Sequence, residues 1–163
     1  VLEKADKLKI ISRYGVGIDN IDLEEAKKRN IEVTITRNCN TEAVADYAIG
    51  LILSVMRHIS TVDKNLKAGT WQKETGINLC HKTVGVVGLG SIGRQVVKRL
   101  KGFDCKILGY DKFLDEAYCK ENDITVMEPE EIFKKADIIT LHVPGNPDGT
   151  EMESSGFGAY VSQ

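Results

Sequence analysis

The polar and apolar positions of residues 1–40 predict a small α/β unit. A short apolar run at Leu8–Ser12 predicts a buried strand, which ends at the turn signals Gly15 and Gly17. The segment Asp22–Asn30 has a helical pattern that starts with a capping residue, and Ile31–Ile35 alternates and is β-branched. A strand, a helix and a strand with short connections are typical of a parallel α/β unit.

The apolar positions between Thr41 and Ala68 recur at three- and four-residue steps, which predicts one long helix. Asn40 or Thr41 can cap its start, and Gly69 can end it. A helix of this length either links two packed bodies or lies within a single core.

A second α/β series follows, and after it the pattern stops. We expect strands at Thr83–Val87, Lys106–Tyr110, Thr125–Met127 and Asp137–Val143, and helices at Ser91–Lys101, Leu114–Glu121 and Glu130–Lys135. Residues 145–163 are rich in Gly, Ser and Asn without any period, and we predict an irregular tail there.

Composition narrows the function classes. The net charge of −2 and the pI near 6.0 give no general attraction to nucleic acid or to an anionic membrane. No apolar run is long enough to span a bilayer, and the first residues do not resemble a signal peptide. The four cysteines contain no C-x-x-C pair, and Cys80-His81 is too sparse for a metal site, so we expect reduced thiols, no metal and a cytoplasmic location.

A glycine-rich loop, G-x-G-x-x-G, lies between a predicted strand and a predicted helix. Gly88 allows the tight turn, Gly90 lets the backbone approach a phosphate, and Gly93 permits close packing of the helix on the strand. The backbone N–H groups of Ser91 and Ile92 are then directed at the anion, aided by the helix dipole. The alternative is a glycine turn that binds nothing.

An acidic residue follows the second strand of this series at the offset that a dinucleotide site needs. Asp111 lies 18 residues after Gly93, where a carboxylate accepts hydrogen bonds from the adenosine ribose and repels a 2′-phosphate. This favours NAD over NADP, although the neighbouring Lys112 works against that preference. The alternative is a solvated strand end.

Four segments together resemble the D-isomer-specific 2-hydroxyacid dehydrogenases. They occur in the family's order and span roughly Leu8 to Pro144. The segments are Arg13-Tyr-Gly-Val-Gly-Ile-Asp-Asn-Ile-Asp22, Asn40-Thr-Glu-Ala-Val-Ala-Asp-Tyr-Ala48, Lys82-Thr-Val-Gly-Val-Val-Gly-Leu-Gly-Ser-Ile-Gly-Arg94 and Leu141-His-Val-Pro144.

The resemblance implies an α/β fold with four regions. Residues 1–40 would be part of a flavodoxin-like substrate domain, and 41–81 a linking helix and joint. Residues 82–144 would form an incomplete Rossmann-type NAD-binding domain with a parallel sheet, followed by the irregular tail at 145–163.

The resemblance also implies site residues. The N–H groups of Gly15-Val16-Gly17 would hold a substrate carboxylate, with Val16 near the nicotinamide. Arg13 would add positive charge, or is simply a surface arginine. The strand end at His142, Val143 and Pro144 would border the adenosine side of NAD, with His142 shaping the wall and transferring no proton.

The activity that follows is hydride transfer between NAD and a D-2-hydroxy acid or its 2-oxo acid, with 3-phosphoglycerate the expected substrate. The family's catalytic Arg, Glu and His lie beyond the motifs matched here, so we assign no catalytic residue and expect no appreciable turnover from these 163 residues alone. The alternatives are an NAD-sensing or protein-binding module and a gene fragment without function. A homodimer through the long-helix region is also implied.

Overall fold

A computed structural model describes residues 2–15, 17, 18, 20–36, 38–143 and 159–161. The chain divides into two compact units, residues 1–41 and 42–163. Each is described separately below.

The first unit contains a short parallel β-α-β arrangement. It consists of a 3-10 turn η1 (Leu2–Lys4), β1 (Ile10–Arg13), α1 (Leu23–Lys28) and β2 (Glu32–Ile35). β1 and β2 pair in parallel, with Ile10 opposite Glu32. The Asp22 carboxylate accepts a hydrogen bond from the Glu25 N–H at 2.9 Å and so caps α1. The predicted strand, helix and strand are present, but β1 is not buried as expected. Ile10 is 51% exposed, because among the described residues β1 belongs to a two-stranded sheet with β2 alone.

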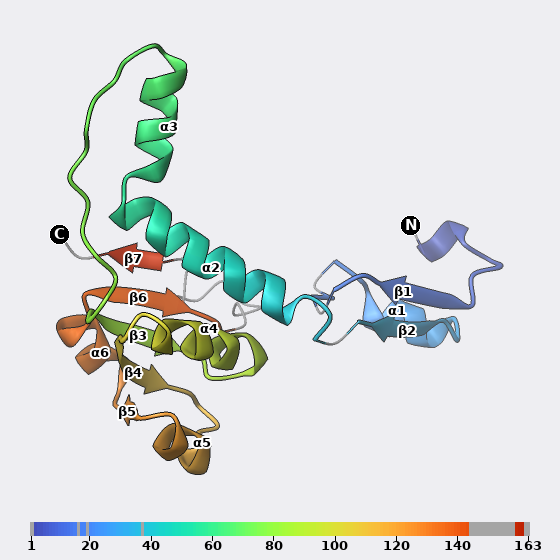
Figure 1. Ribbon diagram of the computed structural model, residues 1–163. Helices are drawn as coiled ribbons and strands as arrows, with labels where there is room; N and C mark the ends of the chain where they lie inside the picture. Colours follow the sequence, from blue (N-terminus) through green and yellow to red (C-terminus); the bar gives the residue numbers. More distant parts are fainter. Residues whose placement is uncertain (1, 16, 19, 37, 144–158, 162–163) are drawn as a thin grey trace. The chain divides into compact units, whose positions relative to one another are not determined.

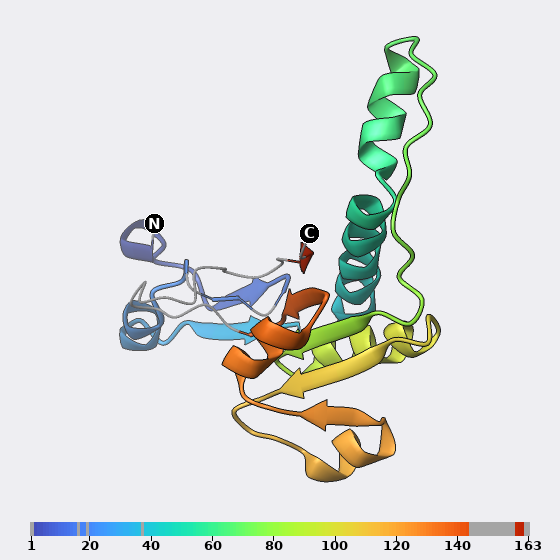
Figure 2. The ribbon, with the colours of Figure 1, turned by 90° about the vertical axis from the view of Figure 1, so that its left-hand side faces the viewer.

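The second unit is built on a five-stranded sheet with the order β5-β4-β3-β6-β7 (Figure 2). Its strands are β3 (Thr83–Val87), β4 (Lys106–Tyr110), β5 (Ile124–Val126), β6 (Ile138–Leu141) and β7 (Ala159–Val161). β3 to β6 are parallel. Because the chain passes from β3 outward to β5 and then returns to the other side of β3, the order reverses beside β3. In open α/β sheets, ligands bind at the carboxyl ends of the strands at such a point.

Helices cover both faces of this sheet. The helices α2 (Thr41–Met56), α4 (Ser91–Lys101) and α5 (Glu116–Glu121) share a core with Val84 and Val86 of β3. Val87 belongs to a second core with α6 (Pro129–Lys135). Because side chains alternate along a strand, the buried run of β3 supplies both cores. The α/β fold with parallel sheets is confirmed, and the predicted strands and helices of this series lie within one or two residues of their expected ends.

The prediction of one long helix from Thr41 to Ala68 is wrong. Two helices, α2 and α3 (Ile59–Lys67), occupy this range and are bent by 68° (Figure 1). His58 separates them in the left-handed region at φ 54°. The Met56 carbonyl accepts the Ile77 N–H at 2.8 Å instead of continuing the helix, and Arg57 binds the Asn78 side chain at 2.8 Å. The segment that returns after α3 therefore ends α2, and the helical period alone cannot reveal this long-range contact.

No single helix among the described residues is long and apolar enough to cross a membrane. The α2–α3 pair reaches the required length and composition only when both helices are counted together across their bend. The apolar residues Ala45, Ile49 and Ile52 of α2 are buried against the sheet, which accounts for their hydrophobicity.

The tail after Pro144 is not irregular throughout. Residues 159–161 form β7, which pairs antiparallel with β6. Sequence pattern missed this strand because three residues are too few to show a period.

The α2 interface supplies a stability prediction. Ile52 is fully buried under α2, whereas Val55, on the same helix, is 53% exposed. We expect Ile52→Ala to lower the unfolding free energy of the second unit by about 2–5 kcal/mol. Val55→Ala should change it by about 0.5 kcal/mol or less. Urea unfolding followed by circular dichroism measures both, and equal losses would contradict this packing.

Candidate functional site

The glycine loop joins β3 to α4, and each of its glycines meets a different environment. Gly88 has φ 95°, and a Cβ there would lie 2.5 Å from the His142 carbonyl oxygen. A Cβ on Gly93 would overlap the Gly88 carbonyl oxygen. A Cβ on Gly90 would meet no atom of the described residues within 4 Å. Two glycines are therefore required by the fold itself, whereas Gly90 is required only if something else approaches the loop.

The start of α4 lies beside Gly90 and has no side-chain cap among the described residues. Gly90 is the N-cap of this helix. The helix begins at Ser91, which is exposed, and Ile92 follows in its first turn. The first N–H groups of a helix have no acceptor within the helix, and its dipole is positive at this end. This arrangement suits a phosphate group.

Asp111 holds the loop in place. One of its carboxylate oxygens accepts the Leu89 N–H at 2.6 Å, and the other accepts the Phe113 N–H at 2.8 Å. The Tyr110 carbonyl accepts the Gly88 N–H at 2.8 Å. The end of β4 therefore fixes the loop after β3, and Asp111 has a bracing role that the sequence spacing did not reveal.

Arg94 is a second residue that supports the loop and that sequence reasoning missed. Its Nε donates to the Leu89 carbonyl at 3.0 Å, and its guanidinium lies 4.2 Å from the centre of the Tyr118 ring. It also pairs with Asp115 at 2.9 Å. The Tyr118 N–H and the Arg94 guanidinium hold the pKa of Asp115 below its usual value. The sequence feature that could have indicated this role is the position of Arg94 directly after Gly93, the last glycine of the motif.

The end of β6 lies against the same loop. The His142 N–H donates to the Val87 carbonyl at 2.7 Å, and the Val143 side chain packs near Gly88. The His142 Nε2 lies 2.9 Å from Thr140 Oγ1, and Thr140 is buried. Burial lowers the pKa of His142 to about 4. At neutral pH this imidazole is uncharged, which suits a wall residue and does not suit a proton carrier. Pro144 lies outside the described residues.

The turn in the first unit is held by its own hydrogen bonds. The Gly15 N–H donates to Thr36 Oγ1 at 2.7 Å, and Arg13 Nε donates to the Gly17 carbonyl at 3.1 Å. The Gly15 donor is thus bound by Thr36, which follows β2, so it is not free for a substrate carboxylate in this conformation. Val16 lies outside the described residues. Carboxylate binding by the remaining groups of this turn stays a prediction.

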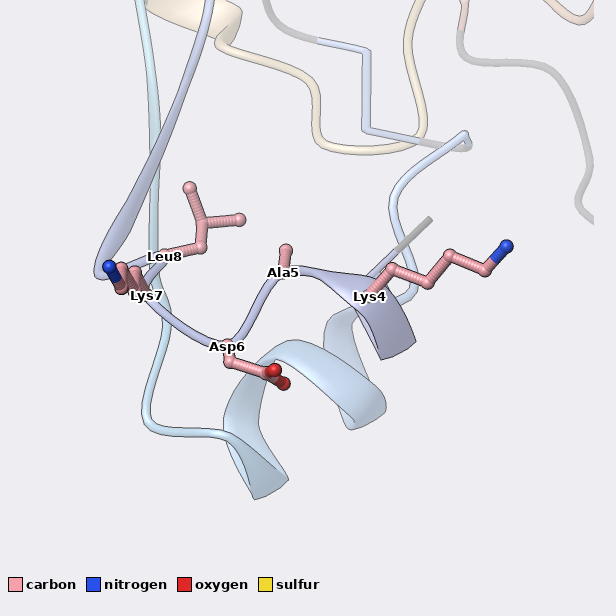
Figure 3. A pocket seen from close by; sticks show the side chains of 5 residues that line it. All are labelled: Lys4, Ala5, Asp6, Lys7 and Leu8. Atoms are coloured by element: carbon pink, nitrogen blue, oxygen red, sulfur yellow. The ribbon is translucent and has the colours of Figure 1, made fainter.

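The first unit also has an open hollow of about 570 Å³, lined by Lys4, Ala5, Asp6, Lys7 and Leu8 (Figure 3). The charged ends of Lys4, Asp6 and Lys7 lie apart from one another in this view. Its polar groups do not converge, so this hollow lacks the arrangement of a binding site.

Comparison with known proteins agrees with the geometry of the second unit. Residues 49–155 match the family described as D-isomer specific 2-hydroxyacid dehydrogenase, NAD binding domain. The chain is 43% identical to a D-3-phosphoglycerate dehydrogenase of Methanocaldococcus jannaschii, over 90% of this chain and 29% of the relative. It is 44% identical to a glyoxylate reductase of Thermofilum pendens, over 88% of this chain and 44% of the relative.

The fold is also similar to that of a solved structure, the apo form of D-lactate dehydrogenase from Escherichia coli. The TM-score is 0.82 and the sequence identity 31%, over 90% of this chain and 48% of that one. The chain therefore spans less than half the length of each of these relatives.

The half-buried imidazole of His142 generates a pH prediction. Its pKa is about 4 in the folded chain, below the ordinary value of 6.5, so the unfolded chain binds the extra proton first. The stabilisation is complete above pH 6.5 and is lost as the pH falls toward 4. We expect His142→Asn to reduce the loss of unfolding free energy between pH 7 and pH 5.

The matched control is His58→Asn, because His58 is exposed and asparagine tolerates its left-handed backbone. Urea unfolding at each pH provides the comparison. An unchanged pH dependence in His142→Asn would show that the half-buried imidazole does not titrate as described.

Proposed function

Because the chain belongs to the D-isomer-specific 2-hydroxyacid dehydrogenase family, we propose that it binds NAD at the glycine loop and forms part of an oxidoreductase acting on a D-2-hydroxy acid. The observation that carries the proposal is the open space beside Gly90. When bound, NAD would supply the hydride acceptor. The chain's own contribution is to bind and orient it.

The residues around the loop fit the parts of a dinucleotide. The N–H groups of Ser91 and Ile92 would hold the pyrophosphate, next to a glycine that leaves room for it. His142 and Val143 would border the adenosine side, where a neutral imidazole costs no buried charge. Ser91 and Ile92 come shortly after the end of β3, and His142 and Val143 directly after the end of β6.

Asp111 would select NAD over NADP. A carboxylate has about four acceptor sites, and the two backbone N–H groups use only part of that capacity. The rest can accept the ribose hydroxyls, while a 2′-phosphate would be repelled. Lys112 does not cancel this charge by pairing with Asp111, because its ammonium lies over the Phe113 ring at 5.9 Å.

The substrate would be a D-2-hydroxy acid or the corresponding 2-oxo acid, with 3-phosphoglycerate as the first candidate. Arg13 would supply charge for its carboxylate, and the N–H groups of the Gly15–Gly17 turn other than that of Gly15 would supply donors, as part of a flavodoxin-like substrate domain. The relatives named above carry several substrate names, so the proposal commits to the acid class and ranks 3-phosphoglycerate first.

We further propose that the protein pairs with a second copy through the α2–α3 region. Figures 1 and 2 show α3 projecting beyond the sheet of its unit. Large apolar side chains are exposed there, including Val55, Ile59, Leu66 and Trp71, the last at 87%. Leu66 and Trp71 also line a hollow of about 260 Å³ with Val62. Contiguous exposed apolar surface of this kind is typical of interfaces.

The cofactor proposal is tested by a pair of glycine substitutions. Gly90→Ala should keep or slightly raise stability, by up to about 1 kcal/mol, because its φ is −71° and its Cβ meets no atom. It should weaken NADH binding at least tenfold, since the new methyl group occupies the phosphate position. NADH fluorescence titration and thermal unfolding measure the two effects.

Gly93→Ala is the matched control. Its Cβ overlaps the chain, so it should lower stability by about 1–3 kcal/mol as well as weaken binding. Wild-type affinity in the Gly90→Ala chain would contradict the proposal, as would the absence of saturable NADH binding to the unsubstituted chain.

The pairing proposal predicts a dimer that Trp71→Glu disrupts. Sedimentation equilibrium should give twice the chain mass for the parent protein and the monomer mass for the variant, because a charge in an apolar interface is costly. Phe113→Glu is the control, since Phe113 is 85% exposed and outside α2–α3. A monomeric parent protein, or equal disruption by both variants, would refute pairing through this region.

A further inference from the structure

Three side chains of types that can bind a metal lie close together at the amino ends of β3 and β4. The glycine loop lies at the opposite ends of these strands. They are Cys80, His81 and Asp104, and one potential ligand atom from each lies within 4.8 Å of the other two. All three are exposed. From the sequence, Cys80-His81 had too few ligands for a metal site. The third group, Asp104, comes from a different turn, so the spacing along the chain did not reveal it.

The fold fixes these two turns against each other. The His81 N–H donates to the Phe103 carbonyl at 3.3 Å, and the β3–β4 pairing starts immediately afterwards at Thr83 and Lys106. His81 and Asp104 both have left-handed backbones, at φ 63° and 53°. The ligand positions are thus set by a sheet register and two defined turns, and only side-chain rotation is left to bring the ligand atoms together.

None of the three side chains has a hydrogen bond or ion pair with another described residue. The neighbouring cation, Lys82, pairs instead with Asp137 at 3.9 Å. The nearby thiol of Cys105 donates to the Leu79 carbonyl at 3.3 Å and is not among the three groups that come together.

One thiolate, one imidazole and one carboxylate are ligands that Zn²⁺ accepts in a tetrahedral site. Ligand atoms about 3.5 Å apart surround such an ion at its usual bond lengths of about 2.0–2.3 Å. Exposed side chains can close from 4.8 Å to that separation by rotation. We propose that Cys80, His81 and Asp104 bind a zinc-like divalent ion, with water as the fourth ligand.

Such an ion would join the turn before β3 to the turn before β4. Because it binds the folded chain, it would raise the thermal stability of the second unit in proportion to the logarithm of its concentration. Its ligands lie outside the glycine loop, so this site is independent of the proposed cofactor binding. The chain could therefore bind NAD without binding a metal ion at this cluster, and it could bind the metal ion without binding NAD.

The test is a titration of the full chain, without a histidine tag and with its thiols reduced, using Co²⁺ alone as the probe. We expect one equivalent to produce thiolate-to-cobalt charge transfer and the intense visible bands of tetrahedral Co²⁺. Zn²⁺ should abolish these bands by displacement, since cobalt binds such sites more weakly. Cys80→Ser, His81→Asn and Asp104→Asn should each weaken binding at least about tenfold.

Two matched controls keep the ligand assignment falsifiable. Cys105→Ser removes the adjacent thiol and Cys39→Ser an exposed thiol of the first unit, and neither should change the affinity. Circular dichroism confirms that each variant is folded. Absence of charge transfer in the parent chain would overturn the proposal, as would unchanged binding in Cys80→Ser or equal loss in Cys105→Ser.

Discussion

The hydrogen bond from the Leu89 N–H to the Asp111 carboxylate, 2.6 Å long, is the contact on which the glycine loop depends. It ties the residue inside the loop to the end of the neighbouring strand. Gly88 then turns against the carbonyl of His142, and Gly93 packs on the Gly88 carbonyl. Of the three loop glycines, Gly90 alone would place a Cβ where no described atom lies within 4 Å.

The strand order of the sheet brings other residues close to the open side of the loop at Gly90. β3 lies between β4 and β6, so the carboxyl ends of three parallel strands bring Leu89, Asp111 and His142 together from distant parts of the sequence. The neutral state of His142 is consistent with a residue that lines the site without transferring a proton. Under the proposed function, the second unit would bind and orient NAD, and NAD itself would supply the hydride chemistry.

Sequence patterns were sufficient where the cause of structure is local. The β-branched run at Thr83–Val87, the cap at Asp22 and the close packing of Gly93 on the Gly88 carbonyl each act within a few residues, and the structure matches these predictions. They were insufficient where a distant segment decides the outcome. Ile77 ends α2 by binding the Met56 carbonyl, Thr36 takes the Gly15 N–H, and Asp104 joins Cys80 and His81 across 23 residues. A one-dimensional period carries no information on such contacts.

A pyrophosphate site formed by the loop and the first turn of α4 can be tested by a two-dimensional ¹H–¹⁵N NMR titration of the chain with NAD. We expect saturable shifts of the Gly90, Ser91 and Ile92 amides, while the Leu89 amide keeps the signature of its bond to Asp111. Saturation that leaves these three amides unmoved would contradict it.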